Sequence, residues 1–93
     1  MLEKKIEQIV CDYAKSRGCL VYKFTSPARA AVPDRMFIAP GGKVFFIEFK
    51  REGQKPTVPQ EREIARLKAQ GVYATVVDSV ERGKLVIDGV MWC

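Results

Sequence analysis

Long apolar runs are absent from this 93-residue sequence, and its cysteines number only three. No stretch approaches the ~18 consecutive apolar residues of a membrane span, and residues 1–5 lack the apolar core of a signal peptide. The three cysteines, Cys11, Cys19 and Cys93, indicate neither a disulfide framework nor a zinc site, because they are odd in number and not spaced as ligands. We expect reduced thiols without a chemical role, in a soluble, cytoplasmic protein that does not contact membranes.

Internal repeats, low-complexity segments and linkers are absent as well. The length suffices for one modest core and is too short for two, so we expect a single domain spanning residues 1–93. Sixteen Lys and Arg residues against eleven Asp and Glu residues give a net charge of +5. A basic balance in a small domain favours a polyanionic partner.

Apolar periodicity predicts a helix at the start of the chain and a strand after it. The helical stripe runs over residues 3–17 and stops at Gly18, and the strand covers residues 19–24. A loop over residues 25–32 follows. Two β-branched and aromatic runs then predict a hairpin, because they flank the turn sequence Pro-Gly-Gly at residues 40–42.

The second half of the chain predicts a strand–helix–strand unit. The hairpin's second strand, residues 43–50, precedes a polar loop and a helix over residues 60–70. An apolar strand over residues 72–77 is expected to be buried on both faces. It should lie parallel to the hairpin strand, because a strand, a crossover helix and a second strand make a right-handed βαβ unit. The sheet is therefore expected to be mixed and covered by helices. For the tail, residues 84–87 and 90–92 around an Asp-Gly turn predict a small hairpin or edge strand.

The hairpin register determines where two carboxylates lie. If the register is symmetric about Gly41, Asp34 lies opposite Glu48, and opposed side chains have Cβ atoms about 4.5–5.5 Å apart. Lys50 shares the face of Glu48. Because like charges there repel and Mg²⁺ prefers one or two carboxylates with water and phosphate, we predict a Mg²⁺ or Mn²⁺ site. In the alternative, Asp34 caps a turn, and Glu48 and Lys50 form a solvated strand end. A one-residue bulge at Gly41-Gly42 would break the register.

Around these residues the sequence resembles the VRR-NUC family, small virus-type nuclease domains within the PD-(D/E)xK nuclease superfamily. The matching segments are K-I-E-Q-I-V, K-F-T-S-P-A-R-A-A-V-P-D-R, F-F-I-E-F-K and P-Q-E-R-E-I-A-R-L. The resemblance covers residues 1 to about 78 and is most specific where S-P-x-R-x-x-V-P-D-R joins E-F-K. The family commonly has a glycine before V-P-D, where this sequence has Ala30-Ala31, a departure that could alter loop shape or DNA fit. The resemblance implies an α/β, restriction-endonuclease-like fold with an αβββαβ core.

The resemblance also implies a role for each matching residue. Asp34 and Glu48 would be the metal carboxylates, and the backbone carbonyl of Phe49 would be a further ligand. Lys50 would orient or activate the attacking water. These roles make physical sense because a bound metal ion lowers the pKa of water, while a nearby ammonium stabilises developing negative charge. The implied cofactor is Mg²⁺ or Mn²⁺.

Two helix residues, Glu7 and Gln60, also match family positions. At ~100° per residue, Glu3 lies about 60° from the centre of the apolar stripe and Glu7 about 100°, so the helical wheel favours Glu3 where the resemblance favours Glu7. Both could instead be solvated carboxylates that pair with lysines. The Gln60 amide could reach the catalytic face, or it could close a capping box with Thr57. These alternatives stay open.

The implied function is metal-dependent cleavage of branched DNA, resembling that of a Holliday-junction resolvase. Two opposed cuts need two sites, so we expect a homodimer. The apolar tail over residues 90–92 could be covered by a partner or could pack on its own core. Flap or nicked-duplex cleavage, or a non-catalytic DNA-binding module, are the alternatives. The family's viral context would place the protein in a bacterial host cell. The expected phosphate contacts, which give affinity without sequence choice, are Lys23, Ser26, Arg29, Arg35, Arg51 and Lys55.

Overall fold

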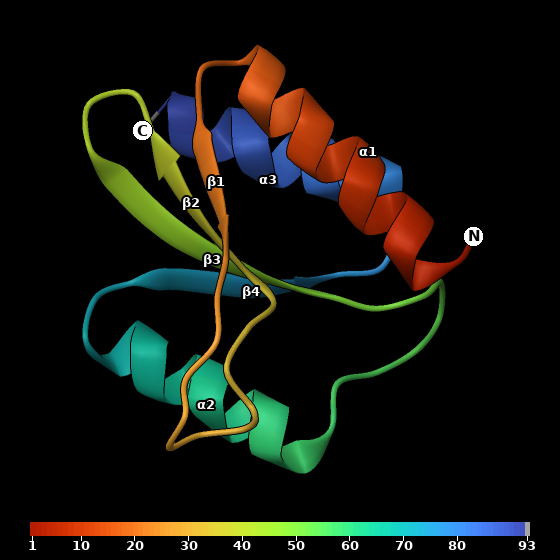
Figure 1. Cartoon of the computed structure of the whole chain (residues 1–93), viewed down its shortest axis with the longest axis vertical. Coiled ribbons are helices and arrows are strands. Elements are labelled where there is room, and N and C mark those ends of the chain that lie inside the picture. The colour runs from red at the N-terminus through yellow and green to blue at the C-terminus, as the bar shows by residue number, and fades with distance from the viewer. Residues whose placement is uncertain (93) are drawn as a thin grey trace.

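Helices cover both faces of a four-stranded sheet in the computed structural model, which describes residues 1–92 (Figure 1). The predicted order of the first six elements is confirmed. Cys11 and Cys19 are buried free thiols, whereas Cys93 lies outside the described residues. The elements are α1 (Glu3–Ser16), β1 (Leu20–Lys23), β2 (Arg35–Ala39), β3 (Lys43–Phe49), α2 (Val58–Ala69), β4 (Tyr73–Val77) and α3 (Val80–Met91).

The sheet is mixed, as predicted, with strand order β1-β2-β3-β4. The first two strand pairs are antiparallel, and β4 runs parallel to β3. In the β2–β3 hairpin Met36 pairs with Phe46 and Ile38 with Val44, which confirms the register symmetric about Gly41. Gly41 itself has a φ of 90°, a left-handed conformation that a side chain would disfavour.

The alternating side chains of β3 connect the sheet to different helices. Phe45 and Ile47 belong to a buried cluster that α1 and α3 complete, while Phe46 packs in a second cluster with Ile64 of α2. Successive side chains of a strand point to opposite faces. Glu48 therefore extends toward the α2 face, one residue before the end of β3.

The C-terminal segment is a helix, so the predicted hairpin or edge strand is wrong. Ser79 caps α3, its hydroxyl accepting a hydrogen bond from the Arg82 N–H at 3.1 Å. Gly83 lets α3 approach α1 closely, because a Cβ there would clash with a methyl carbon of Val10. The Asp88 carboxylate accepts a hydrogen bond from the Tyr13 hydroxyl at 2.7 Å. These contacts with α1 override the local turn preference of Asp-Gly.

Strand β4 is at the edge of the sheet, and the expectation that both of its faces are buried is confirmed only in part. Ala74 and Val77 are buried, but Tyr73 is 47% exposed. Only β3 pairs with β4 among the described residues, which leaves its outer side without a neighbouring strand. Within residues 1–92, no helix has the length and apolar character needed to cross a membrane.

Candidate active site

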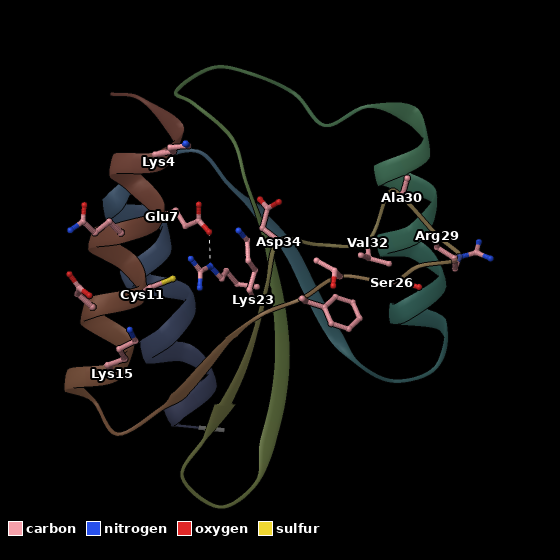
Figure 2. A pocket seen from close by; sticks show the side chains of 15 residues that line it. Lys4, Glu7, Cys11, Lys15, Lys23, Ser26, Arg29, Ala30, Val32 and Asp34 are labelled. Carbon is pink, nitrogen blue, oxygen red and sulfur yellow. Dashed lines mark hydrogen bonds and ion pairs between the residues drawn. The ribbon is translucent and has the colours of Figure 1, made fainter.

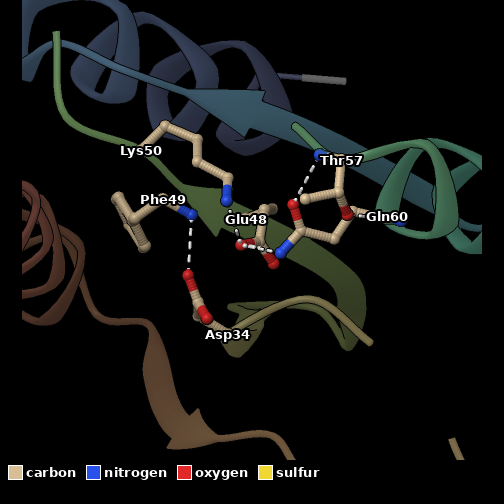
Figure 3. Close-up of polar contacts among 6 residues, drawn as sticks. All are labelled: Asp34, Glu48, Phe49, Lys50, Thr57 and Gln60. Carbon is tan, nitrogen blue, oxygen red and sulfur yellow. Dashed lines mark hydrogen bonds and ion pairs between the residues drawn. The ribbon is translucent and has the colours of Figure 1, made fainter. Parts of the chain in front are cut away.

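The hairpin brings the acidic side chains of the P-D and E-x-K segments together (Figure 3). Arg35 and Ile47 form the last pair of the β2–β3 ladder, so the next residues outward are Asp34 and Glu48. The Asp34 carboxylate accepts a hydrogen bond from the backbone N–H of Phe49 at 2.9 Å. This bond fixes Asp34 beside the strand that carries Glu48, as the register symmetric about Gly41 predicts.

Burial makes it costly for this carboxylate pair to carry two negative charges. Glu48 is 3% exposed, and burial followed by the charge of Asp34 raises the pKa of Glu48 to about 7. Burial also raises the pKa of Asp34, against the lowering effect of the hydrogen bond from Phe49. The cation of Lys50 lowers both pKa values without offsetting the burial. The pair is therefore short of positive charge, a property typical of functional sites.

Lys50 lies beside the pair, where the sequence predicts it. Its Nζ is 3.7 Å from Glu48 Oε2, and the residue is buried. The Lys50 backbone N–H donates to the carbonyl of Val77 at 2.9 Å, so β4 holds the residue in line with β3. The chemical role of this ammonium stays a prediction.

Gln60 satisfies both of the interpretations that its position allows. Its Oε1 accepts a hydrogen bond from the Thr57 N–H at 2.9 Å, and the Thr57 hydroxyl accepts one from the Gln60 N–H at 3.3 Å, which completes the capping box. The Gln60 Nε2 donates to Glu48 Oε2 at 3.0 Å. Helix α2 begins two residues earlier than predicted, at Val58, and this cap aims the amide at the carboxylate (Figure 3).

One oxygen of Glu48 has no hydrogen-bond partner among residues 1–92. Oε2 is contacted by both Gln60 and Lys50, whereas Oε1 is buried and makes no hydrogen bond within the described residues. A buried oxygen of this kind costs free energy unless something positive binds it. This oxygen and the Asp34 carboxylate are hard oxygen donors of the kind that Mg²⁺ and Mn²⁺ bind, with water filling other positions, and the Phe49 carbonyl stays a predicted further ligand. The residues present thus fit the implied ion, although no cluster of three or more His, Cys, Asp or Glu side chains is preformed in residues 1–92.

The two acidic residues of α1 differ in their contacts. Glu7 Oε2 accepts a charge-assisted hydrogen bond from Arg35 Nε at 2.6 Å, so its partner is an arginine of β2 and not one of the lysines that the alternative proposed. The charge of Glu7 helps to raise the pKa of Asp34, and the charge of Glu3 helps to raise that of Glu48. Both carboxylates therefore act electrostatically on the site, and a metal-ligand role for Glu7 stays a prediction.

A polar groove of about 600 Å³ opens beside Asp34, between α1 and the loop of residues 24–34 (Figure 2). Four of the six expected phosphate contacts line it, and Arg51 and Lys55 lie instead in the exposed loop between β3 and α2. The four that line the groove are Lys23, Ser26, Arg29 and Arg35.

Four further residues near the site were not predicted from the sequence. Lys4, Gln8 and Lys15 line the groove from α1, and Figure 2 shows the two lysines at either end of its wall. Their spacing of four and seven residues is a helical one, so periodicity could have found them. Glu63 of α2 binds Arg29, with 2.9 Å between Oε1 and Nε, and the two residues are 34 positions apart in the sequence. No local signal in the sequence marks that pair.

A mixed sheet that brings an aspartate, a glutamate and a lysine to one end, with helices on both faces, defines a restriction-endonuclease-like α/β domain. No protein-family model matches the chain. A protein of Acyrthosiphon pisum secondary endosymbiont phage 1, named "Putative nuclease p44", is 42% identical over 84 residues, which cover 90% of each protein.

Solved structures give the same result. One is described as a VRR-NUC domain and superposes with a TM-score of 0.86 at 30% identity, covering 92% of this chain and 94% of that one. A second structure, described as a VRR-NUC domain protein, superposes with a TM-score of 0.80 at 19% identity, covering 99% of this chain and 89% of that one. At this identity the likeness shows the fold alone. The chain belongs to the VRR-NUC family of nuclease domains.

Proposed function

We propose that this protein is a metal-dependent endonuclease that hydrolyses phosphodiester bonds in DNA. One observation carries the proposal: Glu48 Oε1 is buried, has no partner among the described residues, and belongs to a carboxylate that shares its site with Asp34. A stable fold has little reason to hold two such groups together unless a cation joins them. The phage relative is named as a nuclease, which supports the same reaction class.

The residues of the site divide the work between holding the ion and handling the water. Asp34, Glu48 and the Phe49 carbonyl would hold Mg²⁺ or Mn²⁺, which supplies a Lewis acid and a lower pKa for bound water. Gln60 fixes the orientation of Glu48 through its amide. Lys50, 3.7 Å from Glu48, orients the attacking water and stabilises negative charge on the phosphoryl group.

The free cations of the groove favour one side of the site for the DNA backbone. The groove is lined by three lysines that form no ion pair within residues 1–92: Lys4, Lys15 and Lys23. Among the described residues, the acidic side chains that line it are Asp34 of the carboxylate site, Glu7, which is paired with Arg35, and Asp12. We expect phosphates to follow this α1 wall. Such contacts give affinity that depends on salt and not on sequence.

The direct test is incubation with labelled duplex, flap, nicked and four-way DNA in Mg²⁺ or Mn²⁺. Cleavage that stops on adding a chelator and returns with the metal supports the proposal, and Asp34→Asn serves as the matched inactive control. Binding of these DNAs without cleavage at any metal concentration would favour the non-catalytic module.

Among DNA structures, we favour four-way junctions cut by a homodimer, because paired opposed cuts need two sites related by two-fold symmetry. Of the apolar tail, Val90 and Met91 pack against the core, and Trp92 is 83% exposed. Three more exposed apolar side chains, Val44, Tyr73 and Leu85, line a second groove of about 430 Å³ on the β3–β4 and α3 side.

That exposed apolar surface is the candidate contact between copies. A monomer that cuts flaps or nicked duplex is the alternative. The phage origin of the relative supports action in a bacterial host cell.

A further inference from the structure

The loop that precedes Asp34 is closed at its base and fastened at its tip. At the base, the Phe24 N–H donates to the carbonyl of Asp34 at 2.9 Å, so the catalytic aspartate closes the loop. At the tip, Arg29 Nε donates to Glu63 Oε1 of α2 at 2.9 Å. Residues 24–26, 29, 30, 32 and 34 of this loop line the groove that we propose for DNA (Figure 2). The loop is therefore a wall of the groove, held against α2.

Glu63 is a buried carboxylate outside the catalytic set. Its exposed fraction is 8%, and two cations compensate its charge: Arg29 from the loop, and Arg66 one turn further along α2, with 3.3 Å between Nε and Oε1. Burying a charge is costly, and although the Arg29 side chain is 49% exposed, removing it would leave the buried Glu63 carboxylate with one counter-charge fewer. Glu63 thus holds the loop more firmly than an exposed glutamate would.

The surroundings of the pair allow the loop to come close. Ala28, Ala30 and Ala31 line the small cleft between the loop and α2, together with Pro59 and Arg62. Arg62 adds a third positive charge near Glu63. Small side chains at the three loop positions leave room for the backbone to lie against the helix.

Helix α2 contacts the catalytic end at two points one turn apart. Gln60 binds Glu48 on β3, and Glu63, three residues later on the same face, binds Arg29 in the loop. We propose that Glu63 is a positioning residue that acts through Arg29, holding the loop of residues 24–34 against α2 so that its groove wall is preformed for a DNA strand. The identification of DNA as the ligand rests on the proposed function, whereas the attachment of the loop to α2 through Arg29 and Glu63 does not depend on it.

A competing role for Arg29 makes the opposite prediction. If Arg29 leaves Glu63 to bind a phosphate, then Glu63 competes with DNA, and neutralising Glu63 should strengthen DNA binding. If Glu63 positions the loop, neutralising it should weaken DNA binding, because the loop must be ordered at the moment of association.

The first test needs no DNA and measures amide hydrogen exchange of residues 25–32. Glu63→Gln keeps the size of the side chain and removes its charge, and we expect exchange in this segment to become on the order of tenfold faster. Arg66→Gln is the matched control, because it removes the other cation on Glu63 and leaves the Arg29 contact in place. Unchanged exchange in Glu63→Gln would overturn the proposal. If that variant does not fold, Arg29→Gln breaks the same pair from the exposed side.

The second test separates positioning from general destabilisation by kinetics and metal binding. Glu63→Gln and Arg29→Gln should each raise KM about tenfold with little change in kcat and unchanged Mn²⁺ affinity by calorimetry, and the double variant should be no worse than either. A lower KM in Glu63→Gln, or additive losses in the double variant, would show that Arg29 contacts DNA independently. If the wild-type protein cleaves no DNA, the proposed function fails while the exchange measurement still decides the fastening.

Discussion

Gln60 on α2 donates a hydrogen bond to Glu48 on β3, with 3.0 Å between Nε2 and Oε2, while its own carbonyl oxygen closes the capping box of α2. One side chain therefore links the start of a helix to the orientation of a buried carboxylate. The other oxygen of Glu48, Oε1, is buried and has no hydrogen-bond partner among residues 1–92, so it can accept a cation.

Variants of Gln60 and Thr57 should separate the cap from the site. Thr57→Ala removes the capping hydroxyl and should lower the free energy of unfolding by ~1 kcal/mol with most of the nuclease activity retained. Gln60→Ala removes the cap and the hydrogen bond to Glu48, so it should lose comparable stability and also kcat. Thermal unfolding and single-turnover cleavage measure the two effects. Equal loss of kcat in both variants would mean that the hydrogen bond to Glu48 has no separate role.

Lys50→Ala should abolish cleavage and leave the fold and most of the DNA affinity intact. The reason is that the Lys50 ammonium is proposed to act on the transition state and not on bound substrate. Circular dichroism checks the fold, and DNA binding in Ca²⁺ checks the affinity. Lys68→Ala, on the exposed side of α2, is the control. Full activity in Lys50→Ala would remove this residue from the mechanism.

Asp34→Asn and Glu48→Gln should each weaken Mn²⁺ binding and eliminate turnover. Each change removes one formal charge from a site that must hold a divalent cation. Calorimetric titration of Mn²⁺ into the DNA-free protein measures this, with the exposed Glu61→Gln as control. Wild-type Mn²⁺ affinity in both variants would exclude the carboxylate pair as the metal site.

The metal-free protein should lose stability as the pH rises toward neutrality and beyond. Burial and the charge of Asp34 raise the pKa of Glu48 to about 7, whereas a glutamate in an unfolded chain titrates near ~4.3. Between these two pKa values, Glu48 keeps its proton in the folded state and has lost it in the unfolded state. Its contribution to the free energy of unfolding is therefore complete below the pKa of the unfolded state and is lost as the pH passes the pKa of the folded state.

Urea unfolding at pH ~5 and ~8 measures this loss, and Glu48→Gln should remove part of it. Saturating Mg²⁺ should restore stability at the higher pH, because it binds the folded state. A pH dependence identical in wild type and Glu48→Gln would show that Glu48 titrates normally.

Local sequence patterns predicted the site better than the chain's end. The symmetric register about Gly41 followed from the turn sequence and the strand lengths, and it brought Asp34 to Glu48. Helix α3 was missed because its Asp88-Gly89 pair is a strong local turn signal. The contacts that favour the helix, Tyr13 with Asp88 and Gly83 against Val10, join residues more than 70 positions apart.

The same limit explains which site residues the sequence did not reveal. The two roles of Gln60 were recognised, but they were treated as alternatives, because a sequence does not show that one amide can use its oxygen and its nitrogen in different directions. The partner of Arg29 was not recognised, because Glu63 belongs to a separate element and only the packing of the loop on α2 brings them together.

In solution the protein should be a homodimer that prefers four-way junctions to linear duplex. One domain offers one carboxylate pair, so symmetric cleavage of a junction requires a second copy, and the exposed Val44, Tyr73 and Leu85 offer apolar surface for it. Light scattering of the wild-type protein and of Leu85→Glu tests the assembly, and mapping of cuts on a fixed junction tests the substrate. Leu85→Glu should shift the protein to monomer and lose paired cuts while single cuts of flaps continue. A wild-type monomer that cuts flaps or nicked duplex alone would defeat the junction preference and leave the nuclease proposal standing.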